Sequence, residues 1–272
     1  MTEQGLTGRQ LREIEFHKEY AASKAAERLA PVNFDVIDEA RRRPHNAFWS
    51  AYDRVLAHDL AGKRALVPGC GFGEDAIRLA RLGADVSAFD ISPDVIDIAR
   101  RRCAAFGYQG VSFGVMPCEA LAFPDDYFDL VFFIDILHHV DIPKSVAEIG
   151  RVLKPGRRMI GAELYTHSFL QKRVRESWFV DKALYRVMKK FIYGGDRPYI
   201  TEDEHKIDET EFAVVAAACE TFEAVWFNAF VGRLVPDRLP LVEEADRTLM
   251  RLAGEGGAKI AGRVVFEGVV AK

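Results

Sequence analysis

The chain has 272 residues, 49% of them hydrophobic, which is enough to bury the core of one large domain or of a domain with an insertion. A net charge of -4 excludes a broad basic surface of the kind that binds nucleic acid. The four cysteines form no Cys-x-x-Cys pair and have no histidine at metal-ligand spacing, so we predict reduced thiols and no metal site. The polar N-terminus and the lack of a long apolar run predict a cytoplasmic protein without a membrane span.

Residues 1–60 are predicted to form an N-terminal helical arm, which is helical from about residue 8 to residue 59 and is broken at Pro31 and Pro44. At the spacing i, i+4 and i+7, one face of its first helix carries Glu13, His17 and Tyr20. The plain interpretation of this face is a solvated helix surface.

Residues 61–272 are predicted to form the main domain, in which strand-like and helix-like segments alternate. The predicted strands are Lys63–Pro68, Ala84–Phe89, Val111–Val115, Leu130–Ile134 and Met159–Leu164. The predicted helices are Glu74–Leu82, Pro93–Phe106 and Pro143–Leu153, the last of them closed by the turn Lys154-Pro155-Gly156. This alternation predicts an α/β fold with a parallel sheet covered by helices on both faces.

An aromatic-rich segment at 166–206 interrupts the alternation and is predicted to be an inserted helical cap. Its aromatic residues suit core packing, a homodimer contact or a substrate pocket. Beyond it, the predicted elements are a helix at Glu209–Cys219, a strand at Ala224–Phe230, a helix at Leu239–Leu252 and a strand at Arg263–Val270.

A glycine-rich stretch, ALVPGCGFGEDAIRLA, joins the first strand of the main domain to a helix. Glycines at alternate positions indicate a tight loop whose backbone approaches a ligand, although a simple strand-to-helix turn would have the same form. Asp90 ends the next strand, where its carboxylate can accept hydrogen bonds from both hydroxyls of an adenosine ribose. Glu74 stands where a dinucleotide loop has its third glycine and would repel a pyrophosphate, so NAD and FAD are disfavoured. An adenosine that carries a cation suits this acidic rim better.

Together with the downstream stretches CEALAFPDDYFDLVFFIDILHHV and SVAEIGRVLKPGRRM, the loop resembles the class I S-adenosylmethionine-dependent methyltransferases of the small-molecule type, from about residue 60 to residue 165. The resemblance implies a Rossmann-like, seven-stranded and mostly parallel sheet whose last strand is antiparallel. It also implies that S-adenosylmethionine is bound, with S-adenosylhomocysteine as product. The cofactor-binding residues that it implies are Gly69, Cys70, Gly71, Gly73, Asp90, Ile91, Cys118, Glu119, Asp135, Ile136 and, on a helix that often covers the cofactor as a lid, Tyr20.

Two positions depart from the family pattern. Pro117 replaces an aspartate that often recognises adenine, and Val67 replaces the acid before the glycines. The resulting form, Val-Pro-Gly-Cys-Gly, is similar to that of the thiopurine and halide or thiol methyltransferase branch. Asp75 follows the loop in the first turn of a helix, so we predict that it pairs with the ammonium of the cofactor. The alternative is an acid that merely favours the helix N-terminus.

Methyl transfer from a sulfonium is an in-line displacement that depends on positioning and exclusion of water, and a hydroxyl acceptor also needs a base. His138 and His139 follow the fourth strand and are either structural braces or bases. The full set of candidate catalytic residues is His138, His139, His17 on the lid helix, and Tyr165 and His167 after the fifth strand.

We therefore predict an enzyme that methylates a small molecule, with oxygen as the first choice of acceptor atom and an apolar or aromatic acceptor. The segment DILHH after the fourth strand differs from the Asn/Asp-Pro-Pro-aromatic run of enzymes that methylate nucleic-acid amino groups. Two alternatives remain. One is a methyltransferase for a sugar or lipid intermediate, and the other is a regulatory protein that binds the nucleoside without transferring a methyl group.

Overall fold

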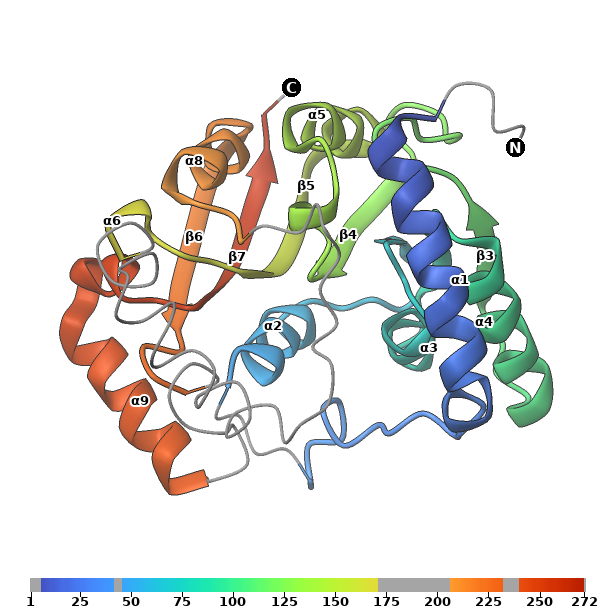
Figure 1. The fold of residues 1–272 in the computed structure, drawn as a ribbon, viewed down its shortest axis with the longest axis horizontal. Coiled ribbons are helices and arrows are strands. Elements are labelled where there is room, and N and C mark those ends of the chain that lie inside the picture. The colour runs from blue at the N-terminus through green and yellow to red at the C-terminus, as the bar shows by residue number, and fades with distance from the viewer. Residues whose placement is uncertain (1–5, 42–45, 171–205, 232–239, 272) are drawn as a thin grey trace.

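The structure, a computed structural model, describes residues 6–41, 46–170, 206–231 and 240–271. Its centre is a sheet with the strand order β3-β2-β1-β4-β5-β7-β6 (Figure 1). The strands are β1 (Arg64–Pro68), β2 (Asp85–Asp90), β3 (Val111–Val115), β4 (Phe128–Ile134), β5 (Leu153–Leu164), β6 (Cys219–Phe227) and β7 (Arg263–Val270). The main helices are α1 (Gly8–Arg28), α2 (Ala47–Leu56), α3 (Glu74–Arg81), α4 (Pro93–Phe106), α5 (Ile142–Val152), α8 (Glu209–Ala217) and α9 (Pro240–Ala253).

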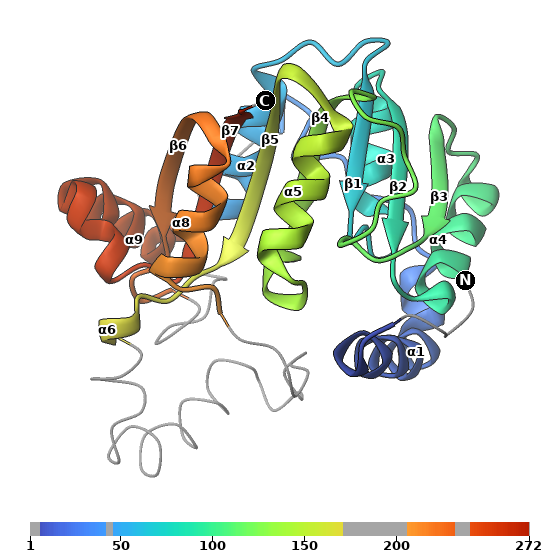
Figure 2. The same ribbon diagram turned by 90° about the horizontal axis from the view of Figure 1, so that it is seen from above.

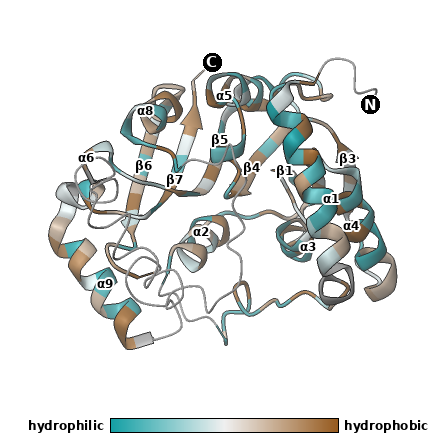
Figure 3. Cartoon of the chain, in the orientation of Figure 1, coloured by the Kyte–Doolittle hydropathy of each residue, from teal (hydrophilic) through white to brown (hydrophobic). Residues whose placement is uncertain are grey.

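The predicted fold is confirmed. The seven strands form one sheet, in which β1, β2, β3, β4 and β5 run parallel and β7 runs antiparallel to both β5 and β6. Helices α2 and α3 lie on one face of the sheet, and α5 and α8 lie on the other (Figure 2). Because both faces are covered, the central strand β4 is almost wholly apolar and buried, as its brown colour shows (Figure 3).

The N-terminal arm differs in part from its prediction. Helix α1 packs along α4, and α2 packs on β5 and β7. Between these helices, residues 29–41 form turns instead of a helix, so the prediction of helix from 8 to 59 is wrong there. Pro31 lies in this non-helical stretch, as expected of a residue that disfavours helix both at its own position and before it.

Three strands begin earlier than predicted, and the smallest difference is at β4, which starts at Phe128 instead of Leu130. Strand β5 starts at Leu153, directly after α5, and takes in the predicted turn, where Gly156 has a φ of +68° and the pairing with β4 shifts register. Strand β6 starts at Cys219 instead of Ala224. It lies at the edge of the sheet, and the exposed Glu220 in its first half hides the apolar pattern on which the prediction relied.

Most of the predicted cap at 166–206 falls on residues 171–205, outside the described residues, so its aromatic residues and the homodimer contact stay predictions. Only the short helix α6 (Ser168–Leu170) at its start is described. In the described ranges, no helix has the length and apolar character needed to cross a membrane.

Gly161 provides a test of how tightly the sheet packs. A Cβ at this position would overlap the ring of Phe266 and lie 2.7 Å from Cε2 of Phe133. We expect Gly161→Ala to lower the free energy of unfolding by about 1–3 kcal/mol, because an overpacked core must shift side chains or backbone. Urea unfolding measures the change. The control is Gly256→Ala, where a Cβ would meet nothing within 4 Å. Equal losses in the two variants would contradict this account of the packing.

Candidate functional site

The carboxyl ends of β1, β2, β3 and β4 lie at one edge of the sheet around a cavity of about 160 Å³. This edge is where doubly wound sheets bind their ligands. The predicted cofactor-binding residues that line the cavity are Gly69, Gly71, Asp90, Ile91, Cys118, Glu119, Asp135 and Ile136. The predicted catalytic residues that line it are His17 and His139. Lining residues that the motifs did not indicate are Gln10, Phe89, Met116 and Val140.

The glycine loop after β1 brings bare backbone to the cavity. Gly69 and Gly71 have φ values of +57° and +51°, in the left-handed region that favours glycine. A Cβ at Gly69 would lie only 2.5 Å from Cδ1 of Ile136, so the loop and the segment after β4 touch. Side chains in these places would close the space between the two segments.

Asp90, the last residue of β2, is 5% exposed. Its Oδ2 accepts the backbone N–H of Gly71 at 3.1 Å, and its Oδ1 accepts that of Ser92 at 3.0 Å. A carboxylate oxygen can accept more than one hydrogen bond, so both oxygens keep acceptor capacity for a ligand. The glycine loop and the start of α4 thus fix the orientation of this carboxylate.

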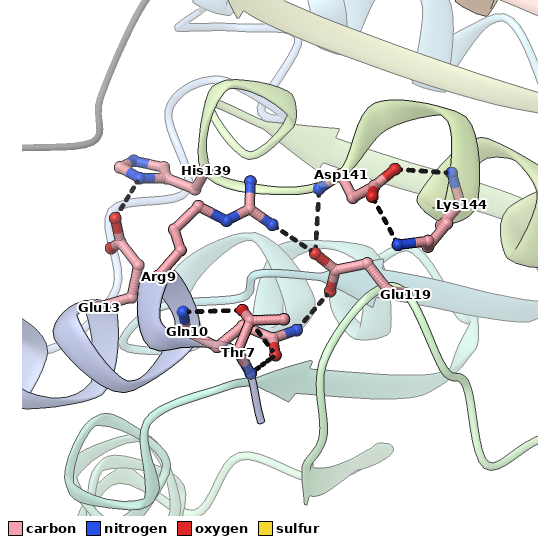
Figure 4. A network of polar contacts seen from close by, with 8 residues as sticks. All are labelled: Thr7, Arg9, Gln10, Glu13, Glu119, His139, Asp141 and Lys144. Atoms are coloured by element: carbon pink, nitrogen blue, oxygen red, sulfur yellow. Dashed lines mark hydrogen bonds and ion pairs between the residues drawn. The ribbon is translucent and has the colours of Figure 1, made fainter. Parts of the chain in front are cut away.

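The loop after β3 supplies Cys118 and Glu119. Burial raises the pKa of the Cys118 thiol to about 12, so the side chain is neutral at ordinary pH and adds apolar surface to the cavity. Glu119 joins three segments: its carboxylate accepts hydrogen bonds from Arg9 Nη2 at 2.6 Å, from Gln10 Nε2 at 3.1 Å and from the backbone N–H of Asp141 at 2.9 Å (Figure 4). Through these bonds Glu119 holds the first turn of α1 against the cavity.

Asp135 follows β4 and has a φ of +56°, which is uncommon for a residue other than glycine. Its backbone N–H donates to the Ala162 carbonyl at 2.9 Å. Its carboxylate accepts two hydrogen bonds from the guanidinium of Arg263 on β7, at 2.9 and 2.7 Å. The chain therefore turns sharply at the end of β4, and this turn brings the next residues to the cavity.

The two histidines after β4 have different surroundings. His138 is 3% exposed, and its Nδ1 lies 2.9 Å from Oε2 of Glu163, a fully buried carboxylate that also accepts the backbone N–H groups of Ile136 and Leu137. His139 lines the cavity, and its Nδ1 lies 3.3 Å from Oε1 of Glu13. The surroundings of His138 suit a structural brace, and those of His139 suit a group that meets a ligand.

Helix α1 forms one wall of the cavity. Gln10, Glu13 and His17 all line it, and Glu13 is only 4% exposed. The interpretation of this helix face as a solvated surface is therefore wrong. The sequence contains one signal that could have corrected this interpretation. Charged and polar side chains recur at helical spacing on α1, and the loop after the third predicted strand carries Glu119, an acid with which they can pair.

Asp75 has partners within the protein. Its Oδ1 accepts hydrogen bonds from the Tyr52 hydroxyl at 2.5 Å and from Arg78 Nη1 at 2.7 Å. Burial, together with the negative charge of Asp75, raises the pKa of Tyr52 well above its usual value. The pairing of Asp75 with a cofactor ammonium stays a prediction, and Arg78 would compete for the same carboxylate.

Three further predicted cofactor-binding residues lie near the cavity without lining it. Cys70 is buried and donates its backbone N–H to the Phe89 carbonyl at 2.9 Å, while Gly73 is the residue that precedes α3. Tyr20 packs against Phe72 of the glycine loop, with 5.8 Å between the ring centroids. The buried Cys70 and the partly buried Tyr20 therefore support the glycine loop.

Tyr165 and His167, at the end of β5, also lie outside the lining that the described residues form. Tyr165 is 1% exposed and packs against Trp226, and burial raises its pKa to about 12. Nδ1 of His167 lies 3.7 Å from a carboxylate oxygen of Glu209. Their catalytic roles stay predictions.

Asp135, His138 and Glu163 have potential ligand atoms within 4.8 Å of one another, as in a metal site. Each carboxylate already has strong partners, since Asp135 binds Arg263 with both oxygens and Glu163 accepts backbone N–H groups. A cation would have to displace the guanidinium, so this cluster is better explained as structural.

The chain is similar in sequence to several known proteins. Residues 66–160 match the family model of a methyltransferase domain. A magnesium-protoporphyrin O-methyltransferase of Rhodobacter capsulatus is 33% identical over 178 residues, which cover 64% of this chain and 76% of that protein. A ubiquinone biosynthesis O-methyltransferase of Methylocella silvestris is 34% identical over 141 residues, which cover 52% of this chain and 55% of that protein. The match thus spans only about half the length of this second relative.

Solved structures agree with the fold. A geranyl diphosphate C-methyltransferase from Streptomyces coelicolor, crystallised with Mg²⁺, geranyl diphosphate and S-adenosyl-L-homocysteine, has a TM-score of 0.57 at 15% identity and covers 98% of this chain and 100% of its own. An S-adenosylmethionine-dependent methyltransferase of Methanosarcina mazei has a TM-score of 0.51 at 19% identity and covers 81% of this chain and 99% of its own. At these identities the likeness concerns the fold alone.

Glu119 provides a test of how α1 is held. We expect Glu119→Gln to speed hydrogen exchange of the amides in the first turns of α1 about tenfold, because the loss of charge-assisted hydrogen bonds costs roughly 1.4 kcal/mol. Exchange followed by mass spectrometry measures it. The control is Glu15→Gln on the same helix, since the Glu15 side chain is 63% exposed and pairs with Lys18 at the surface. Unchanged exchange in Glu119→Gln, or an equal change in the control, would contradict this attachment.

Proposed function

Since the chain belongs to the class I S-adenosylmethionine-dependent methyltransferases, we propose that it transfers a methyl group from S-adenosylmethionine to an oxygen of a small molecule. The observation that carries the proposal is the cavity where the glycine loop, Asp90 and Glu119 meet beneath α1. Two of the relatives are named as O-methyltransferases for small molecules, which supports the same class of acceptor.

The residues of the cavity suit this cofactor. The oriented carboxylate of Asp90 can accept the ribose hydroxyls, and Met116 and Cys118 offer apolar surface for the adenine. Four carboxylates line the cavity, on Glu13, Asp90, Glu119 and Asp135. Those of Glu119 and Asp135 are paired with Arg9 and Arg263, so the charges of Asp90 and Glu13 are the ones that favour a ligand with positive charge. When bound, S-adenosylmethionine supplies an electrophilic methyl group on a sulfonium.

His139 is the residue that we propose as base. It lines the cavity beside the residues of the cofactor site, and a neutral imidazole is suited to accept a proton near neutral pH. In the proposed step, the acceptor O–H bond breaks and the proton moves to Nε2 of His139. The O–CH₃ bond forms as the S–CH₃ bond breaks, and that electron pair remains on sulfur. Helix α1, as a wall of the cavity, would exclude water from this step.

Binding and transfer can be tested together. We expect calorimetry to detect binding of S-adenosylmethionine and S-adenosylhomocysteine. With methyl-tritiated S-adenosylmethionine and protein-free extracts of microbial and plant cells, label should enter a small-molecule product. Tight binding without labelled product in any extract would contradict methyl transfer and favour a regulatory role. No binding of either compound would overturn the proposed function.

The control for the binding site is Asp90→Asn. An amide has one acceptor oxygen and no charge, so we expect S-adenosylhomocysteine to bind about tenfold more weakly, which equals roughly 1.4 kcal/mol. Melting of the ligand-free variant checks the fold, because the amide can accept the N–H of only one of Gly71 and Ser92. Unchanged affinity would mean that Asp90 serves the loop alone.

A further inference from the structure

Glu13 is a nearly buried carboxylate between two imidazoles. It lies on α1, it is 4% exposed, and its Oε1 lies 3.3 Å from Nδ1 of His139. Its Oε2 lies 3.7 Å from Nε2 of His17, one turn further along the helix. All three side chains line the cavity. Burying a carboxylate costs free energy unless hydrogen-bond donors surround it, so the contacts of Glu13 need an explanation.

The contact with His139 determines which ring nitrogen carries the proton. With Glu13 ionised, its carboxylate can only accept, so Nδ1 of His139, 3.3 Å away, is the donor in this contact. A neutral imidazole has a single N–H, and its Nε2 is then an acceptor. In the part of the chain that the structure describes, Nε2 of His139 has no hydrogen-bond partner, and the residue faces the cavity.

His138 is the alternative partner for a substrate, and its geometry argues against this role. Nδ1 of His138 lies beside a carboxylate oxygen of Glu163, just as Nδ1 of His139 lies beside one of Glu13. His138, however, is 3% exposed and does not line the cavity. The two rings lie 4.1 Å apart between centroids. Two carboxylates thus orient two adjacent imidazoles, and of the two imidazoles only that of His139 lines the cavity.

We propose that Glu13 is a positioning residue for methyl transfer: it holds His139 as the Nδ1–H tautomer, so that Nε2 can take the proton of the acceptor hydroxyl. The negative charge of Glu13 also stabilises the imidazolium that forms when this proton arrives. Glu13 belongs to α1, and the hydrogen bonds from Arg9 and Gln10 to Glu119 hold the start of this helix in place. These bonds therefore also keep Glu13 close to His139 (Figure 4). This inference rests on the proposed function.

The tautomer can be measured without any substrate. In protein labelled with ¹⁵N-histidine and saturated with S-adenosylhomocysteine, the imidazole nitrogens of the seven histidines are observed by NMR, and His139→Gln identifies the signals of that residue. We expect the Nδ1–H tautomer at His139 in the unmodified protein. Glu13→Leu should shift it toward Nε2–H, and Glu15→Gln, on the exposed side of α1, should leave it unchanged. An Nε2–H tautomer in the unmodified protein would overturn the inference.

Kinetics with an acceptor found by the labelling experiment separates positioning from a purely structural role. Glu13→Gln keeps an acceptor for Nδ1–H and removes the charge, so we expect kcat to fall roughly ten- to a hundredfold. This loss is at or below the lower end of the roughly 10²–10⁴-fold that general base catalysis supplies, because the base itself is kept. The KM of the acceptor and the affinity for S-adenosylhomocysteine should stay nearly constant. Unchanged kcat with a raised KM, weaker cofactor binding and a lower melting temperature would overturn the inference. If no acceptor were found, the proposed function would fail, while the tautomer measurement would still be interpretable by itself.

Discussion

The carboxylate of Asp90 is the constraint on which the rest of the site depends. At 5% exposure it needs hydrogen-bond donors, and it finds them in the N–H of Gly71 from the loop after β1 and the N–H of Ser92 before α4. The bond from Gly71 ties the loop after β1 to the end of β2, and the bond from Ser92 fixes the carboxylate against the start of α4. Since β3, β2, β1 and β4 are neighbours in the sheet, the loops after all four strands then lie at the same place. The chemistry of the cavity thus follows from strand order and one oriented carboxylate.

Helix α1 completes the cavity in two different ways. Its middle packs by apolar contact, with Ala21 in one buried cluster with Val95 and Ile98 of α4. Its first turns are held by polar contact with Glu119, and the helix as a whole is largely hydrophilic (Figure 3). Hydrogen bonds to water can replace hydrogen bonds within the protein at a small cost in free energy, whereas water cannot replace apolar contacts in this way. The part of α1 that covers the cavity is therefore held by polar contacts with Glu119, and its later part by apolar contacts with α4.

The sequence was most informative about features that depend on residues close to one another in the chain. Alternation of apolar runs and helices predicted a parallel sheet covered on both faces, and the family resemblance supplied its seven strands and its antiparallel last strand. The glycines and Asp90 predicted the edge of the sheet at which the cavity lies. It failed where a residue's surroundings depend on distant segments. Glu13 has the spacing of a solvated helix face, and only its approach to the turn after β4 shows that it is buried. Tyr52 of α2 donates a hydrogen bond to Asp75, a contact that the sequence does not reveal, while the pairing of Asp75 with a cofactor ammonium stays a prediction. The start of β6 was missed because an edge strand can expose charged residues such as Glu220.

The most direct test of the account is a crystal structure of the protein with S-adenosylhomocysteine. The account predicts density for the ribose within hydrogen-bond distance of the Asp90 carboxylate, the adenine beside Cys118, and the sulfur on the side of the cavity that His139 lines. Density for the ligand at any other edge of the sheet, or an adenosine at this edge that makes no contact with Asp90, would contradict it.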